Sequence, residues 1–183
     1  LAFKIFRLTR GNAWLLGLIL ILLTGVTSSL LNNVTAMLLL APLTIQIAEI
    51  VGVHPFAYVI PEVLAANIGG AATLIGDPPS TIVGLHLGLG FLEYAIQAAP
   101  VVVMSMLLLI AQSAWLYRHE MAGAKKHYSP ALMRQLEASA QIAEPSLLRK
   151  TCIVGAVTLF LFFVAELFDL PSSVVALTGA LGA

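Results

Sequence analysis

Polar side chains interrupt the apolar sequence at two places, and the first is the stretch NNVTAMLLLAPLTI, residues 32–45. The amides of Asn32 and Asn33 and the hydroxyl of Thr35, with carbonyls freed at a helix break, are neutral oxygen ligands that suit a hard cation such as sodium. A helix that begins here also points its N–H groups and positive dipole end inward, which suits an anion. The same side chains could instead cap a helix in an external turn. Both interpretations stay open.

The second stretch is ANIGGAATLIGDPPSTIVG, residues 66–84. Gly69 and Gly70 permit unusual backbone angles, whereas Pro78 and Pro79 cannot continue a preceding helix but can start a new one, with Asp77 near its N-cap. This pattern predicts a discontinuous helix. Backbone of this kind inside a membrane must be buried in protein or line water.

Side chains around this break could complete the cation site predicted at the first stretch. The candidates are the Asn67 amide and the Thr73 hydroxyl, which offer further neutral oxygens. Asp77 is an ionisable group in a membrane segment, so it is a candidate for ion or proton coupling, and equally for a structural cap. Glu62 and Glu166 could also take part in proton movement, although their places near predicted span ends favour the interface.

The sequence offers no pattern for other chemistry. The four histidines have no metal-ligand spacing, and His54 and His86 fall where loops are expected. Nucleotide-binding, zinc-protease and nucleophile-elbow motifs do not occur, so we expect no enzyme, no ATP-driven pumping by this chain and no cofactor other than a sodium ion. Cys152 is the single cysteine and lies in an apolar run, which excludes an intrachain disulfide.

Composition makes the chain a membrane protein. Of 183 residues, 60% are hydrophobic and 10% charged, against about 25% charged in soluble domains. The formal net charge is zero, so no global field attracts a nucleic acid, and the expected partner is the lipid bilayer. Because the chain opens on Leu1 and stops within an apolar stretch, we interpret it as a fragment of a longer protein.

The basic residues indicate the topology. All nine lysines and arginines lie in residues 4–10 and 118–150, and none lies between Gly11 and Tyr117. Since such clusters mark the cytoplasmic side, residues 1–10 and 118–150 should share the cytoplasmic face, separated by an even number of crossings. We expect an all-α membrane fold in a bacterial-type plasma (inner) membrane.

Five segments follow from the apolar pattern. Residues 1–12 suit an interfacial amphipathic helix or, equally, the end of a spanning helix. Residues 13–52 are expected to form a re-entrant helical hairpin, from runs 13–31 and 34–52, with two full spans as the alternative. Residues 53–117 hold the broken helix (within 55–90) and a transmembrane helix (95–117). A cytoplasmic linker, 118–150, precedes a further span at 151–168, within a last segment of 151–183.

The two polar stretches resemble those of the ion transporter superfamily, which has citrate-transporter-like domains. The similarity is strongest to the branch of arsenical pump membrane proteins and the melanosomal P protein, marked by a hairpin of the form xNVTxxLLLxPxTI and a later xNIGGxATxIGDPPxxI stretch. Asn32, Ala66, Ala71 and Ser80 depart from many relatives, which have aspartate, serine, threonine and asparagine there. Without an aspartate at position 32, Asp77 and Glu62 remain the charged candidates.

The resemblance implies an inverted-repeat transporter with elevator-like movement, in which residues 151–183 start the second repeat. At matching positions, a set of polar and small residues would border a cation and substrate site: Asn33, Thr35, Asn67, Gly69, Gly70 and Thr73. The resemblance also implies homodimerisation and a site shared with the second repeat.

We therefore expect a secondary active permease for a small ion or anion, driven by a sodium or proton gradient. The cargo could be arsenite, a carboxylate, chloride, or sodium exchanged for protons. The alternatives are a passive ion channel and, from another class, an intramembrane aspartyl protease that would pair Asp77 with Asp169.

Overall fold

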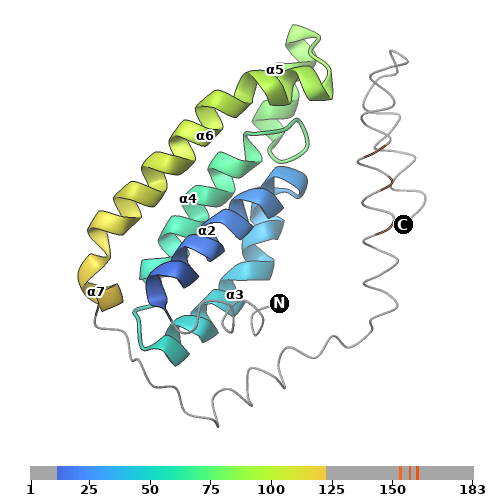
Figure 1. Ribbon diagram of the computed structural model, residues 1–183. Coiled ribbons are helices and arrows are strands. Elements are labelled where there is room, and N and C mark those ends of the chain that lie inside the picture. Colours follow the sequence, from blue (N-terminus) through green and yellow to red (C-terminus); the bar gives the residue numbers. More distant parts are fainter. Residues whose placement is uncertain (1–11, 123–152, 154–156, 158–159, 161–183) are drawn as a thin grey trace.

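The computed structural model describes residues 12–122, together with Ile153, Val157 and Phe160. The elements of the described part are all helices: α2 (Ala13–Leu30), α3 (Asn33–Val51), α4 (Phe56–Gly70), α5 (Pro78–Leu87), α6 (Phe91–Leu116) and α7 (Arg118–Ala122) (Figure 1). The predictions for residues 1–11, for most of the linker and for nearly all of 151–183, with Cys152, Glu166 and Asp169, lie outside the described residues.

Helices α2 and α3 form a hairpin joined by Leu31 and Asn32. Each helix begins after an asparagine whose side-chain oxygen accepts a backbone N–H: Asn12 from Trp14, and Asn32 from Val34. At its other end α3 stops at Gly52, which has a left-handed φ of 73°, as helix C-termini commonly do. The two runs predicted at 13–31 and 34–52 are thus confirmed as helices, with bounds within about a residue.

Helix α4 runs parallel to α2 along a closely packed seam. Thr24 of α2 bonds Glu62 of α4, and Ser28 bonds the carbonyl of Ala66 at the same sequence separation. A Cβ built on Gly69 would lie 2.0 Å from the carbonyl oxygen of Gly25, so the two backbones touch there. Small residues that allow such an approach are typical of helix pairs in membranes.

The chain leaves the helical path between Gly70 and Pro78, so the predicted discontinuous helix is confirmed. The break starts later than the glycine pair suggested: Gly69 and Gly70 are the last residues of α4, and neither has a positive φ. They are needed for close packing rather than for unusual angles. His86, expected in a loop, lies in the last turn of α5.

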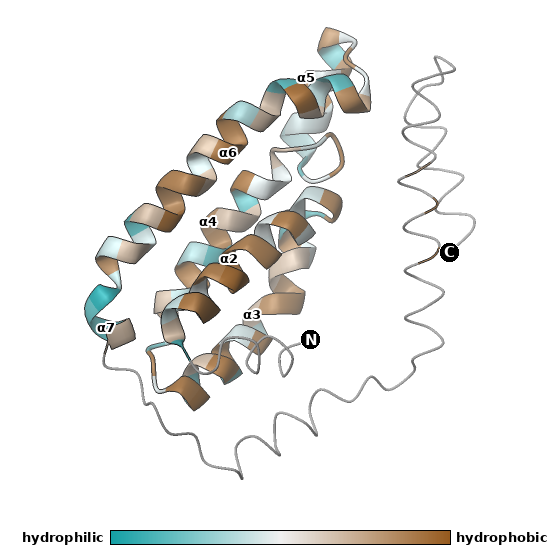
Figure 2. Cartoon of the chain, viewed as in Figure 1, coloured by the Kyte–Doolittle hydropathy of each residue, from teal (hydrophilic) through white to brown (hydrophobic). Residues whose placement is uncertain are grey.

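Helix α6 returns along α4 (Figure 1). It starts at Phe91, a few residues before the predicted 95, and its 26 residues span about 39 Å. Helices α2, α3 and α6 are long and apolar enough to cross a membrane. Hydrophobic residues recur along all three helices (Figure 2). Many of the large apolar side chains are exposed, and along α6 these include Val101, Val103, Met104, Leu107 and Leu108.

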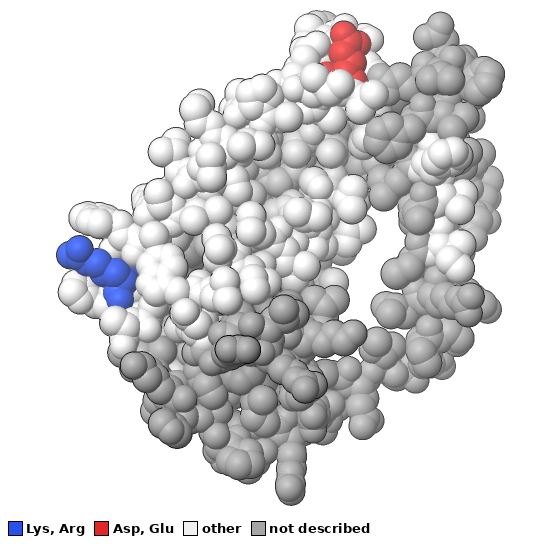
Figure 3. Space-filling view, viewed as in Figure 1, with Lys and Arg blue, Asp and Glu red and all other residues white. Residues whose placement is uncertain are grey.

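Both ends of the hairpin and the end of α6 meet at one end of the bundle. Ala13, Val53 and Met121 belong to one buried apolar cluster with the ring of Tyr58, whose hydroxyl donates to the carbonyl oxygen of Ala13. On the face shown in Figure 3, a basic side chain lies at the α7 end and an acidic side chain at the opposite end. The described residues between them on this face are neither Lys, Arg, Asp nor Glu. The start of α2 and the chain at α7 therefore lie at the same end of the bundle.

Candidate functional site

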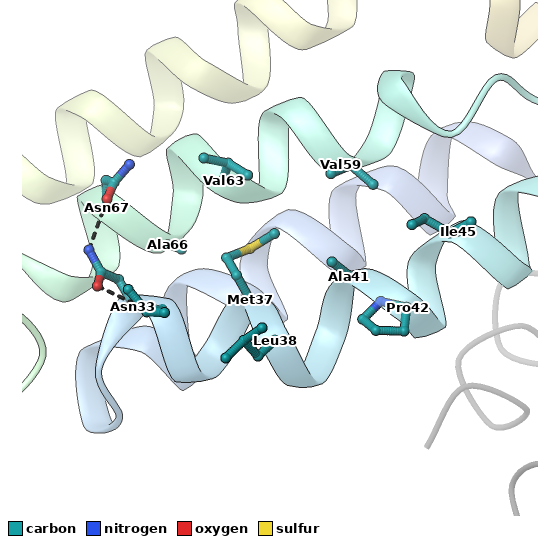
Figure 4. A pocket seen from close by; sticks show the side chains of 11 residues that line it. Asn33, Met37, Leu38, Ala41, Pro42, Ile45, Val59, Val63, Ala66 and Asn67 are labelled. Atoms are coloured by element: carbon teal, nitrogen blue, oxygen red, sulfur yellow. Dashed lines mark hydrogen bonds between the residues drawn. The ribbon is translucent and has the colours of Figure 1, made fainter.

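The hairpin tip meets the end of α4 through two amides. Asn33, the first residue of α3, donates from Nδ2 to Oδ1 of Asn67 over 3.0 Å (Figure 4). Asn67 is exposed and Asn33 is partly exposed, so both amides are accessible. The structure thus brings together one predicted residue from each polar stretch.

The other predicted residues of the tip differ in their surroundings. Asn32 caps α3, since its Oδ1 accepts the N–H of Val34 over 2.9 Å. Thr35 is exposed on the first turn of α3. The N–H of Asn33 bonds the carbonyl of Gly76, so the first two N–H groups of α3 are already paired. The cap interpretation of Asn32 holds, and Asn33 carries the contact across the tip.

Thr73 holds the break against the hairpin. Its hydroxyl donates to the carbonyl of Ser29 over 2.5 Å and accepts the N–H groups of Ile75 and Gly76 over 3.3 Å each. The Thr73 side chain thereby forms hydrogen bonds with three backbone groups, in a segment where the backbone does not form a helix. Thr73 positions the loop beside the amide pair, and its direct contact with an ion stays a prediction.

The remaining predicted residues of the break are Gly69, Gly70 and Asp77. Gly69 and Gly70 are buried, and a Cβ on Gly70 would lie 3.4 Å from the hydroxyl oxygen of Ser28. Asp77 occupies the N-cap position of α5, but its side chain makes no cap hydrogen bond. Its partly exposed carboxylate is therefore not used as the predicted cap.

An apolar groove of about 510 Å³ leads away from the amide pair, between α3 and α4 (Figure 4). Asn33 and Asn67 stand at one end, and Ile45 and Val59 lie toward the other. The rest of the wall is built from aliphatic side chains, Met37 and Pro42. A cavity with few polar groups at one end is a common form of ligand site.

Glu62 lies inside the bundle, and its place near the membrane interface stays a prediction. Its side chain is 0% exposed, and its Oε1 accepts the hydroxyls of Thr24 and Thr44 over 3.0 Å each. Oε2 is buried and has no hydrogen-bond partner in the described structure. The sequence signal for this cluster is a threonine in each of two mostly apolar helices, Thr24 and Thr44, and neither is among the predicted site residues.

The two amide oxygens of the pair are ligands of the type that suits a hard monovalent cation, and they would make up part of its coordination. Asn33 and Asn67 have neutral amide oxygens, the ligand type that sodium accepts. Each oxygen already accepts one hydrogen bond: Asn33 Oδ1 from the Val34 N–H over 2.8 Å, and Asn67 Oδ1 from Asn33 Nδ2. Among the described residues, no three His, Cys, Asp or Glu side chains come together in a way that would hold a metal ion. Any transition-metal or zinc centre would need ligands from outside this part of the chain.

Comparison with known proteins identifies the family of the chain. The family model described as "Citrate transporter" matches residues 1–182. The chain belongs to the citrate transporter family. This confirms the superfamily indicated by the two polar stretches, and with three apolar helices of spanning length it makes the chain an integral membrane protein of a transporter family.

Several proteins similar to this chain are named as transporters. Two are uncharacterized transporters of Mycobacterium tuberculosis: Rv2685 is 37% identical over 179 residues, and Rv2684 is 36% identical over 172. The human P protein is 48% identical over 82 residues, which are 45% of this chain and 10% of that protein. The match to Rv2685 includes 96% of this chain but only 41% of Rv2685, so the chain spans about two fifths of the length of that relative. No solved structure matches the chain.

Proposed function

We propose that the whole protein is a secondary active transporter that moves a small ion or anion with the energy of a sodium or proton gradient. The observation that carries this proposal is the Asn33–Asn67 pair, which joins the hairpin tip to the end of a broken helix. Broken helices that face polar groups at membrane depth are the usual ion and substrate sites of secondary transporters.

In this proposal the two amide oxygens bind sodium, and the cargo occupies the neighbouring groove. A bound cation would replace the hydrogen bond between the amides, because both Oδ1 atoms would then turn toward it. Thr35 is two residues from Asn33, and Asp77 follows Gly76, whose carbonyl accepts the Asn33 N–H, so both could contribute. The second repeat would close the site from the other side. Arsenite, a carboxylate and chloride remain the candidate cargoes, with sodium–proton exchange as the other mode.

The proposed topology is a re-entrant hairpin over residues 13–52 in an inner membrane, with residues 1–10 and 118–150 in the cytoplasm. Helix α4 supports this proposal, because its 15 residues span about 22 Å, less than the ~30 Å of the hydrocarbon core. The loop after α4 contacts the hairpin tip, so both would lie at membrane depth. Elevator movement and homodimerisation extend the proposal.

The direct test is thermal unfolding of the full-length protein in sodium, potassium and choline chloride at matched ionic strength. A ligand that binds only the folded state raises the unfolding midpoint. We expect a sodium-specific rise that Asn33→Ala abolishes. Asn12→Ala is the control: it removes the asparagine cap of α2, away from the amide pair, at a cost of about 1 kcal/mol, and should keep the sodium response.

A second measurement separates carrier from channel. In sealed vesicles, a carrier accelerates the flux of labelled cargo when unlabelled cargo is present on the other side. An open pore would give no such exchange. A sodium response equal in wild type and Asn33→Ala would remove the amide pair from the proposed site.

A further inference from the structure

We propose that Glu62 is a proton-binding site in the interior of the bundle, with the proton on Oε2, separate from the amide pair at the hairpin tip. The ligand is a single proton. The proposal rests on the surroundings of the carboxyl group and holds whichever cargo the protein moves.

The carboxyl group is enclosed on every side by helices. Glu62 is fully buried, and so are its two partners, Thr24 of α2 and Thr44 of α3. Both hydroxyls approach the same oxygen, Oε1. An oxygen that accepts two hydrogen bonds is the expected carbonyl oxygen of a neutral acid, which leaves Oε2 as the protonated atom.

Within the part of the chain that the structure describes, no cation is placed to balance an ionised Glu62. Helices α2, α3, α4 and α6 contain no lysine, arginine or histidine at all. The basic side chains of the described residues are at helix ends or in connections, and all are exposed: His54, His86, Arg118 and His119. A buried charge without a partner is strongly unfavourable, and the group then takes up a proton instead.

The other titratable groups on these helices lie elsewhere. Helix α2 has none, and Glu49 of α3 is exposed. Tyr58 of α4 donates to the carbonyl of Ala13. On α6, Glu93 is exposed and the Tyr94 hydroxyl bonds the carbonyl of Ala71. Glu62 is therefore the one carboxyl group at the centre of the described helices.

This position joins proton binding to helix packing. Glu62 connects both arms of the hairpin to α4, because Thr24 and Thr44 come from the two arms. Loss of the proton would leave a charge whose Oε2 has no donor among the described residues. Water or a cation would have to enter, or the arms would have to separate from α4.

Infrared difference spectroscopy of the full-length protein at neutral pH tests the proposal. A protonated carboxyl group has a C=O stretching band separate from the carboxylate and amide bands. We expect this band in wild type and its loss in Glu62→Gln, which keeps the shape of the side chain and an oxygen for the threonines. Glu49→Gln, an exposed glutamate on α3, is the matched control and should leave the band unchanged.

Two threonine variants make the assignment independent of Glu62→Gln. Thr24→Val and Thr44→Val each remove one hydrogen bond to the C=O oxygen, and each should shift the band to higher frequency. These variants decide the question even where Glu62→Gln does not fold. A carboxylate band, rather than a carboxylic acid band, that disappears in Glu62→Gln would overturn the proposal, as would a band insensitive to both threonines.

Discussion

Gly69 of α4 lies against the backbone of α2, where its missing side chain decides how close the two helices come. An added Cβ would lie 2.0 Å from the Gly25 oxygen and 2.7 Å from the Gly25 Cα. Backbone atoms cannot move aside as a flexible side chain can. The helices would therefore have to part, which would also stretch the bonds of Ser28 and Glu62 farther along the seam.

We predict that Gly69→Ala lowers stability by about 3 kcal/mol or more, the upper end of the usual cost of overpacking. The measurement is the thermal unfolding midpoint of the purified protein, together with its monodispersity. Gly17→Ala is the comparison, because its Cβ would meet only side-chain atoms, Cε1 of Tyr58 at 3.0 Å and Cε of Met121 at 3.3 Å, so a much smaller shift is enough. Equal losses for both variants would contradict the importance of the backbone contact.

At the scale of elements, the loop between α4 and α5 owes its shape to Thr73. We predict that Thr73→Val destabilises the protein by about 1–3 kcal/mol, since it leaves the Ile75 and Gly76 N–H groups without their acceptor. Thr73→Ser should restore most of the stability. The measurement is again the unfolding midpoint, with Thr35→Val, an exposed threonine of α3, as control.

The same variant separates positioning from ion binding. If Thr73 acts through the loop, Thr73→Val weakens the sodium response and Thr73→Ser recovers it in parallel with stability. A sodium response that Thr73→Val leaves at full strength would show that the amide pair does not depend on the loop.

The sequence predicted the elements well because their ends are marked locally. Asn32 and the Pro78–Pro79 pair act on the backbone next to them, so the hairpin and the helix break could be located without the fold. Glu62 could not be placed in this way. Its partners lie 38 and 18 residues away, and only the packing of α4 against both arms of the hairpin brings all three together.

The candidate site was predicted in part for the same reason. Asn33 and Asn67 were named from their residue types, and the structure adds that they bond each other. The glycines were named as flexible points, whereas close packing explains them. That difference depends on which surface another helix covers, and a single sequence does not state it.

At the scale of the whole molecule, the fold makes a prediction about sidedness. Ala13, Val53 and Met121 share a cluster, so the chain near residues 12, 54 and 119 should face one side of the membrane. With Cys152 replaced by serine, we predict that Asn12→Cys, His54→Cys and His119→Cys react with a membrane-impermeant thiol reagent from the cytoplasmic side only. Sealed vesicles of known orientation provide the measurement.

The control for sidedness is His86→Cys in α5, at the other end of the described bundle (Figure 1). It should not share the labelling pattern of the three positions. Reaction of positions 12 and 119 from opposite sides would mean an odd number of crossings and would contradict the arrangement.

The parallel pairing of α2 with α4 has a consequence for biosynthesis. The ribosome completes α2 and α3 before α4 exists, so for that interval the hydroxyls of Thr24, Ser28 and Thr44 have no Glu62 or Ala66 carbonyl to meet. A nascent hairpin would then expose polar groups to lipid, which opposes its release from the insertion machinery. The hairpin should therefore stay at the translocon until α4 emerges, and the three helices should enter the bilayer together.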